Sequence, residues 1–161
     1  MFIRTAITDD LKIITAVEQE CFPPSQAASE DLFRDRLRIY PDHFLLLFDG
    51  DRLVSFLDGF TTDEEDLSDR MYDDAYMHDE NGAWQMIFGV NTIPSYRQRG
   101  CAALLIKQAI AKASREGRKG LVLTCKKELI EYYSRFGFVN EGVTELSVKG
   151  GVCWYQMRLL L

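Results

Sequence analysis

Hydrophobic residues recur along this chain at two spacings, one typical of amphipathic helices and one typical of buried strands. Apolar positions three or four residues apart predict helices over residues 8–20, 30–40, 101–116 and 127–135. Continuous or alternating apolar runs predict strands over residues 2–6, 43–48, 52–60, 84–92, 120–125, 138–148 and 152–160. The resulting order, βααβββαβαββ, and the length of 161 residues predict a single α/β domain over residues 1–161.

The longest polar stretch joins the third and fourth of these strands. Residues 61–82 contain nine acidic residues and one arginine, Arg70, with methionine and tyrosine side chains between them. One interpretation is a solvated loop or a short surface helix. The other is a lid, because loops above about 15 residues without structure are uncommon in compact domains. Its carboxylates would attract an amine while its aromatic rings pack on the apolar part of a substrate.

Composition narrows the classes of function. Hydrophobic residues make up 47% and charged residues 27%, no apolar run is long enough to span a membrane, and no signal peptide is visible. The net charge of −6 argues against general nucleic-acid binding and is compatible with a cationic partner. None of the four cysteines shows C-x-x-C spacing, so we expect reduced thiols in a cytoplasmic protein without a metal site.

The turn between the strand over 84–92 and the following helix has the chemistry of an anion site. The first N–H groups of a helix have no intrahelical partner, and the helix dipole favours negative charge there. Arg97 and Arg99 add two positive charges, and Gly100 allows a tight turn. The pattern therefore predicts that this turn binds a pyrophosphate.

Two motifs resemble those of the GCN5-related N-acetyltransferase (GNAT) family. Arg97-x-x-Gly100-x-Ala102, preceded by Pro94-Ser95-Tyr96, resembles the acetyl-CoA signature of that family. Residues 131–138, EYYSRFGF, are similar to its "FYxxxGF" segment. Cys21-Phe22-Pro23-Pro24 and the acidic residues 63–65 resemble the arylalkylamine (serotonin-type) branch. The resemblance spans nearly the whole chain. It implies a mixed, mostly antiparallel sheet of six to seven strands flanked by about four helices, and acetyl transfer from acetyl-CoA.

The resemblance also implies roles for particular residues. Strand residues would hydrogen-bond the pantetheine arm of acetyl-CoA, after a bulge at Gly89, and these are Val90, Asn91 and Thr92. Residues of the turn would bind the pyrophosphate, and these are Arg97, Gln98, Arg99, Gly100, Cys101, Ala102 and Ala103. Thr124 and Cys125 would flank the acetyl group, and Tyr133 would protonate the departing thiolate, with Tyr132 as the alternative. A covalent route through Cys125 is disfavoured, because no histidine is placed to activate the thiol.

The general base is the gap in this resemblance. Arylalkylamine acetyltransferases relay the amine proton through two histidines, and Met86 and Phe88 stand at those positions here. The chain's only histidines are His43, expected to be structural, and His78, expected to be solvated. A water chain to a carboxylate is one substitute, with Asp58, Asp63 or Glu64 as candidates. Direct binding of the neutral amine is another.

Three functions follow from these features. The first is transfer of acetyl to a small-molecule primary amine by direct attack in a ternary complex. The second is acetylation of a protein N-terminus or lysine, and the third is a catalytically inactive protein that binds acyl-CoA for regulation. We expect no metal, nucleic-acid or membrane partner, and either a monomer or a homodimer. The apolar segment 152–160 is a candidate for pairing with, or packing on, another subunit.

Overall fold

A computed structural model describes residues 1–161, and the chain divides into two compact units. Unit 1 comprises Met1–Gly59 and Gly89–Ala109, and unit 2 comprises Phe60–Phe88 and Ile110–Leu161. Helix α4 (Cys101–Arg115) begins within unit 1 and ends within unit 2. Six short 3₁₀ helices occupy connections: Thr8–Asp10, Pro41–His43, Ala75–Met77, Pro94–Tyr96, Lys127–Leu129 and Lys149–Gly151.

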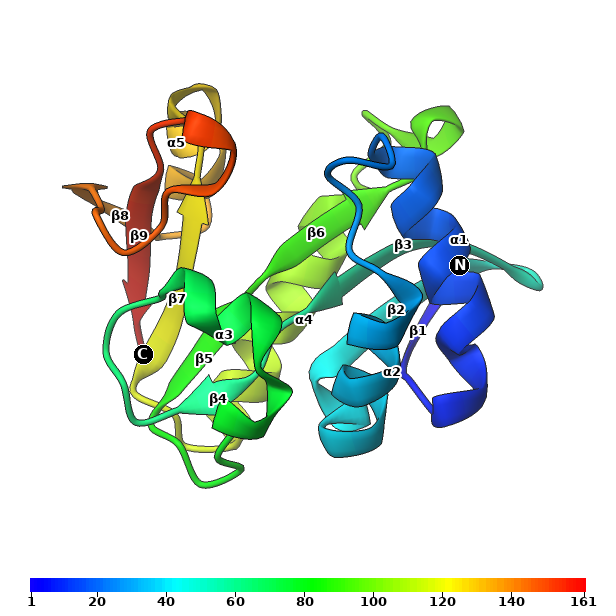
Figure 1. Ribbon diagram of the computed structural model, residues 1–161, viewed down its shortest axis with the longest axis horizontal. Helices are drawn as coiled ribbons and strands as arrows, with labels where there is room; N and C mark the ends of the chain where they lie inside the picture. Colours follow the sequence, from blue (N-terminus) through cyan, green and yellow to red (C-terminus); the bar gives the residue numbers. More distant parts are fainter. The chain divides into compact units, whose positions relative to one another are not determined.

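Unit 1 is built on a four-stranded antiparallel sheet in the order β1-β2-β3-β6. These strands are β1 (Phe2–Thr5), β2 (Phe44–Asp49), β3 (Arg52–Asp58) and β6 (Gly89–Thr92). Helix α1 (Leu11–Cys21) packs on β3, on β6 and on helix α2 (Glu30–Ile39), which Figure 1 draws in cyan beside it. Strand β6 is the end strand of this sheet, so one of its edges is not paired within the sheet.

The core of unit 1 is aromatic. The rings of Phe33, Phe44 and Phe56 meet with centroids 5.9–6.5 Å apart, and all three side chains are buried. The predicted cap of the second helix is confirmed, because Ser29 Oγ accepts the Leu32 N–H at 3.2 Å. One buried ion pair joins α2 to β3, with Arg36 Nη1 2.8 Å from Asp58 Oδ2.

Unit 2 is built on a five-stranded sheet in the order β4-β5-β7-β9-β8. The strands are β4 (Thr61–Thr62), β5 (Trp84–Ile87), β7 (Gly120–Cys125), β8 (Val139–Val143) and β9 (Tyr155–Leu160). The β5–β7 pair is parallel, and all other pairs are antiparallel. Two five-residue helices complete the unit, α3 (Asp69–Asp73) and α5 (Ile130–Ser134). The mixed, mostly antiparallel strand pairing expected from the sequence is therefore confirmed.

The structure differs from the prediction in three details. The structure has nine strands in two sheets, where one sheet of six to seven strands was expected. The strand predicted over 84–92 is two strands, because β5 pairs with β4 and β7 while β6 pairs with β3. They meet at Phe88–Gly89, where a bulge was expected. The connection 61–82 adds β4 and α3, which raises the number of α-helices to five.

The expectation for the C-terminal segment needs correction as well. Strand β9 has β7 on one edge and β8 on the other, so neither edge of it is open to pair with another subunit. The end strand on that side is β8, where Val139 and Val143 are exposed. No helix is both long enough and apolar enough to cross a membrane.

Candidate functional site

The turn from β6 to α4 holds two residues in the left-handed backbone region. Gln98 has a φ of 61° and is the only non-glycine residue with positive φ, and Gly100 has a φ of 80°. Glycine adopts this conformation without the steric cost that a Cβ brings. Gly100 thus lets the chain reverse sharply before Cys101, the first residue of α4. The N-terminus of a 15-residue helix therefore follows directly after the basic turn.

Both arginines of the turn are exposed, and each is oriented by a neighbour. Arg97 Nε donates to the carbonyl oxygen of Thr92 at 3.0 Å, at the end of β6. The Arg99 guanidinium lies 5.0 Å from the centroid of the Tyr96 ring, and the Tyr96 hydroxyl donates to Asp49 Oδ2 at 2.6 Å. An anion at this turn would meet two positioned cations and the helix N-terminus.

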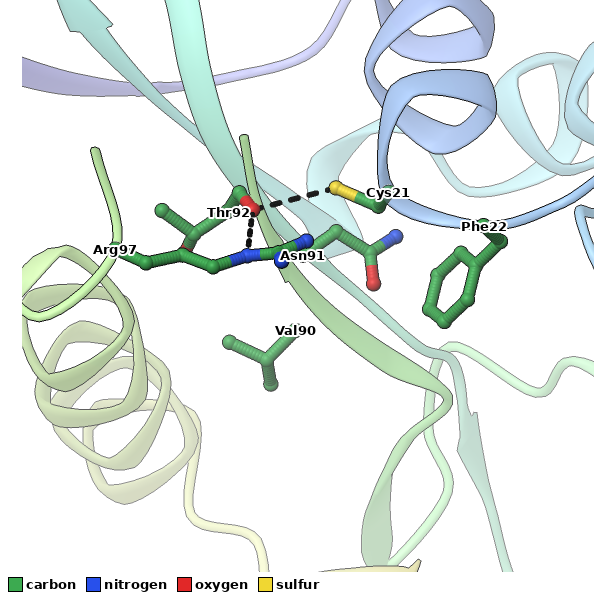
Figure 2. A pocket seen from close by; sticks show the side chains of 6 residues that line it. All are labelled: Cys21, Phe22, Val90, Asn91, Thr92 and Arg97. Carbon is green, nitrogen blue, oxygen red and sulfur yellow. Dashed lines mark hydrogen bonds between the residues drawn. The ribbon is translucent and has the colours of Figure 1, made fainter. Parts of the chain in front are cut away.

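A cavity of about 230 Å³ lies along β6. Three of the residues predicted to hold pantetheine line it, together with three others: Val90, Asn91, Thr92, Cys21, Phe22 and Arg97. Figure 2 shows Cys21 and Arg97 converging on the Thr92 carbonyl, to which Cys21 Sγ also donates at 3.3 Å. The cavity therefore brings the predicted pantetheine strand and the first residue of the predicted pyrophosphate turn together.

Glu18 holds Asn91, one of the residues that line this cavity. Glu18 was not among the predicted site residues. Its Oε1 accepts from Asn91 Nδ2 at 2.6 Å, and its Oε2 accepts the Ala28 N–H at 2.8 Å. Burial raises the pKa of Glu18. The signal was present in the sequence, because Glu18 follows Ile14 by four residues and precedes Cys21 by three. A carboxylate in the apolar stripe of a helix needs buried partners.

In unit 2, Tyr133 lies on α5 in an aromatic cluster. Its ring meets Tyr132 at 5.3 Å and Phe138 at 6.1 Å between centroids, with edge-on geometry in both pairs. Burial raises the pKa of Tyr133, and the neighbouring Cys125 and Tyr132 add to the rise. The phenol is therefore protonated at neutral pH, as a proton donor must be. Burial also raises the pKa of Tyr132, so protonation state alone does not separate the two tyrosines.

Thr124 and Cys125 end β7, as the sequence predicted. Cys125 is buried and its Sγ lies 3.5 Å from Met157 Sδ. Burial raises the pKa of the Cys125 thiol to about 11. A thiol with that pKa contains almost no thiolate at pH 7, which argues against a covalent acyl intermediate.

A second cavity, of about 120 Å³, lies within unit 2. Its lining residues come from α3, from β7 and from the connections before β6 and β9: Asp69, Tyr72, Phe88, Thr124, Ser147, Lys149 and Trp154. Thr124 was predicted to flank the acetyl group, and Phe88 stands where a relay histidine was expected. Asp69 and Tyr72 belong to the connection 61–82, for which a lid was one interpretation, and the remaining lining residues were not predicted.

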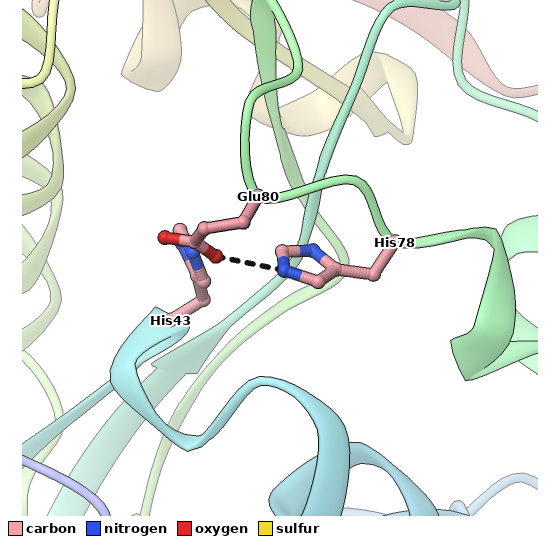
Figure 3. A group of neighbouring side chains, drawn as sticks. All are labelled: His43, His78 and Glu80. Atoms are coloured by element: carbon pink, nitrogen blue, oxygen red, sulfur yellow. Dashed lines mark hydrogen bonds and ion pairs between the residues drawn. The ribbon is translucent and has the colours of Figure 1, made fainter.

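Of the two expectations for the histidines, the one for His43 is confirmed and the one for His78 is wrong. His43 is buried, as a structural histidine should be, and it closes the 3₁₀ helix before β2. His78 was expected to be solvated, but its side chain is only 6% exposed. Its Nδ1 accepts the Thr61 N–H at 3.2 Å, and Figure 3 shows its Nε2 facing Glu80 Oε2, 2.8 Å away. His78 therefore ties the acidic connection to β4.

The candidate carboxylates differ in how free they are to accept a proton. Asp58 is 2% exposed and is held by the Arg36 guanidinium. Asp63 and Glu64 are exposed, and Asp63 Oδ1 accepts the Ala83 N–H at 3.0 Å. Met86, at the first relay position, is fully buried on β5. The structure assigns no single base among these residues.

Comparison with known proteins places the chain in a family. The family model described as "Acetyltransferase (GNAT) family" matches residues 11–138, most of the chain. The chain belongs to this family. Three similar solved structures show that the GNAT fold extends over the whole chain. The loading GNATL domain of CurA from Lyngbya majuscula has a TM-score of 0.83 at 15% identity, with 99% of this chain and 96% of that chain covered.

The other two similar structures are of proteins with different activities. The GphF GNAT-like decarboxylase, in complex with isobutyryl-CoA, has a TM-score of 0.80 at 17% identity and 99% coverage of both chains. The ribosomal-protein-S18-alanine N-acetyltransferase from Escherichia coli has a TM-score of 0.73 at 16% identity, with coverage of 99% and 92%. At these identities the likeness shows the GNAT fold and leaves the acceptor of this chain open.

Proposed function

We propose that this GNAT protein transfers the acetyl group of acetyl-CoA to a primary amine of a small molecule, by direct attack in a ternary complex. One observation carries the proposal. In a chain of the acetyltransferase family, a cavity along the end strand β6 runs to Arg97, at the start of a basic turn that precedes the α4 N-terminus. An edge strand offers backbone groups to an extended arm, and the turn offers positive charge to a pyrophosphate.

The residues then have the following roles. Val90, Asn91 and Thr92 hold the pantetheine arm. The pyrophosphate is bound by the turn and the first residues of α4, namely Arg97, Gln98, Arg99, Gly100, Cys101, Ala102 and Ala103. Thr124 and Cys125 flank the acetyl group, and Cys125 remains a thiol. Membership of the arylalkylamine branch stays a prediction. Met86 and Phe88, which stand at the positions of its two relay histidines, cannot relay a proton. The proposed chemistry needs no metal.

The proposed reaction forms one bond and breaks one. The nitrogen of the neutral amine attacks the thioester carbonyl carbon, and the carbon–sulfur bond then breaks. Tyr133 gives its phenolic proton to the departing CoA thiolate, and the phenolate regains a proton that the amine nitrogen has released to water. A phenol of raised pKa is protonated before each turnover. A thiol of pKa near 8.5 is protonated at neutral pH, so the net transfer is favourable once the phenolate has regained its proton.

Mass-spectrometric detection of acetylated product and free CoA tests this proposal. The acceptor panel contains arylalkylamines, polyamines, aminoglycosides and lysine peptides, each with acetyl-CoA. Tyr133→Phe should lower kcat by about 100-fold or more, the contribution typical of general acid catalysis. Tyr132→Phe is the matched control, since it removes a neighbouring hydroxyl from the same cluster, and it should leave kcat nearly unchanged.

Three results would contradict the proposal. A larger loss in Tyr132→Phe than in Tyr133→Phe would move the acid to Tyr132. Binding of acetyl-CoA without turnover of any amine would favour the regulatory acyl-CoA-binding function. Turnover of lysine peptides alone would replace the small molecule by a protein acceptor.

A further inference from the structure

Two residues that line the second cavity each carry a buried polar atom without a hydrogen-bond partner. Ser147 is 3% exposed, and its Oγ is buried without a partner. Asp69 Oδ1 is likewise buried and unpartnered. An unsatisfied buried polar group is unfavourable, so a ligand that supplied hydrogen-bond donors to both atoms would be stabilised here.

Backbone contacts hold these two residues in place. Asp69 Oδ2 accepts the Val148 N–H at 2.8 Å, and the Asp69 N–H donates to the Leu146 carbonyl at 3.0 Å. Through Asp69, helix α3 is thus hydrogen-bonded to the residues on either side of Ser147. The two unpartnered oxygen atoms are therefore fixed before any ligand arrives, which lowers the entropic cost of binding.

The remaining walls are aromatic and mutually packed. The Phe88 ring lies 4.8 Å from the Tyr72 ring, and the Trp154 Nε1–H donates to the Lys149 carbonyl at 2.9 Å. Lys149 Nζ lies 4.0 Å from the centroid of the Tyr72 ring. Lys149 and Asp69 carry opposite charges, so the lining has no net charge. A bound nitrogen therefore does not need to be cationic.

The size of the cavity limits what enters it. Its volume of about 120 Å³ is smaller than the roughly 150 Å³ of an engineered protein cavity that binds benzene. An aromatic ring would therefore not be enclosed, whereas a short unbranched aminoalkyl end would. Tyr72, which lines the cavity, is one of the groups that raise the pKa of Tyr133, and so is Cys125, which follows the lining residue Thr124. The cavity and the proposed acid therefore belong to the same part of unit 2.

We propose that this cavity binds the amine end of the acceptor, a primary amine on a short unbranched chain. The two N–H groups of the neutral amine donate to Asp69 Oδ1 and Ser147 Oγ, and the nitrogen lone pair is left for attack. A ligand hydroxyl has one hydrogen to donate and would have to accept from the Ser147 hydroxyl, whereas an amine can donate to both oxygens. The identity of this ligand as the acceptor rests on the proposed acetyl transfer, but its binding does not require acetyl-CoA.

Titration of the full chain with propylamine, followed by NMR of the two tryptophan indole N–H groups, tests the proposal. The Trp154 indole should shift and saturate, while Trp84, which is buried against Arg158, should stay in place. Asp69→Asn keeps an oxygen for the Val148 N–H but removes the charge, and it should raise the Kd by about tenfold or more. Ser147→Ala should raise the Kd by a smaller factor. Asp73→Asn removes an exposed carboxylate from the same helix and should leave the Kd unchanged.

Several outcomes would overturn the amine site. These are no Trp154 shift, equal effects of Asp69→Asn and Asp73→Asn, or binding of 1-propanol as tight as that of propylamine. An unshifted Trp84 signal in each variant shows that the fold is intact. Saturable binding that depends on Asp69, without acetylation of any amine, would overturn the transfer and support the site. Turnover of an amine with an unchanged KM in Asp69→Asn would support the transfer and overturn the site.

Discussion

At the scale of single residues, the partner of a buried carboxylate decides its ionisation. Asp10 is 5% exposed, and hydrogen bonds from Arg4 at 2.7 and 2.8 Å lower its pKa. Glu18 has no such cation bonded to it, and burial raises its pKa. The first carboxylate stabilises the fold when ionised, whereas ionising the second costs free energy.

Asp10→Asn should therefore destabilise the protein in a pH-dependent way. Because the folded pKa of Asp10 lies below its usual value of 3.8, the stabilisation is complete above that value and is lost as the pH falls through the folded pKa. We expect a loss of about 1–2 kcal/mol in the free energy of unfolding at pH 7. Urea denaturation of the wild type and of Asp10→Asn, at pH 7 and at pH 3, measures this difference in unfolding free energy. A difference that stays constant between the two pH values would contradict this account.

The sequence predicted site residues where local chemistry carries the signal. Arg97, Arg99 and Gly100 were found because a charged turn before a helix has a recognisable composition. Asp69 and Ser147 could not be found, because only the fold brings residues 78 positions apart to one cavity. One acidic residue among the nine of the connection 61–82 does not differ from the others in sequence.

At the scale of elements, long periodic segments were predicted well and short ones were not. The helix over 101–116 and the strand over 120–125 match α4 and β7 within a residue. Helix α3 has five residues and buries only Met71, too few positions to show a period. The division of 84–92 at Phe88 depends on which strands pair with each half, and apolar periodicity does not contain that information.

Helix α4 offers a matched pair of glycines for separating stability from binding. Gly100 before the helix and Gly117 after it have φ values of 80° and 75°, and a Cβ at either would meet nothing within 4 Å. Alanine at each should cost about 1 kcal/mol of unfolding free energy through backbone strain alone. Only Gly100→Ala should also weaken acetyl-CoA binding, measured by calorimetry. Equal losses of affinity in the two variants would show that the turn has no particular role.

At the scale of the whole molecule, the net charge opposes binding of the proposed ligand. The chain carries a net charge of −6, yet acetyl-CoA is itself strongly anionic. Attraction must therefore come from the local turn with Arg97 and Arg99. The fold is shared with a GNAT-like decarboxylase and an N-acetyltransferase at 16–17% identity. Fold alone therefore cannot name the acceptor, and the argument for an amine rests on particular side chains.

The most direct test of the central claim is a calorimetric titration of the protein with acetyl-CoA, compared with acetyl-pantetheine, which lacks the pyrophosphate and the adenosine. We predict saturable binding of acetyl-CoA that weakens with added salt, and binding of acetyl-pantetheine that is weaker by about tenfold or more. Equal affinities for the two ligands, or no binding of acetyl-CoA, would contradict the assignment of the β6–α4 turn as a pyrophosphate site.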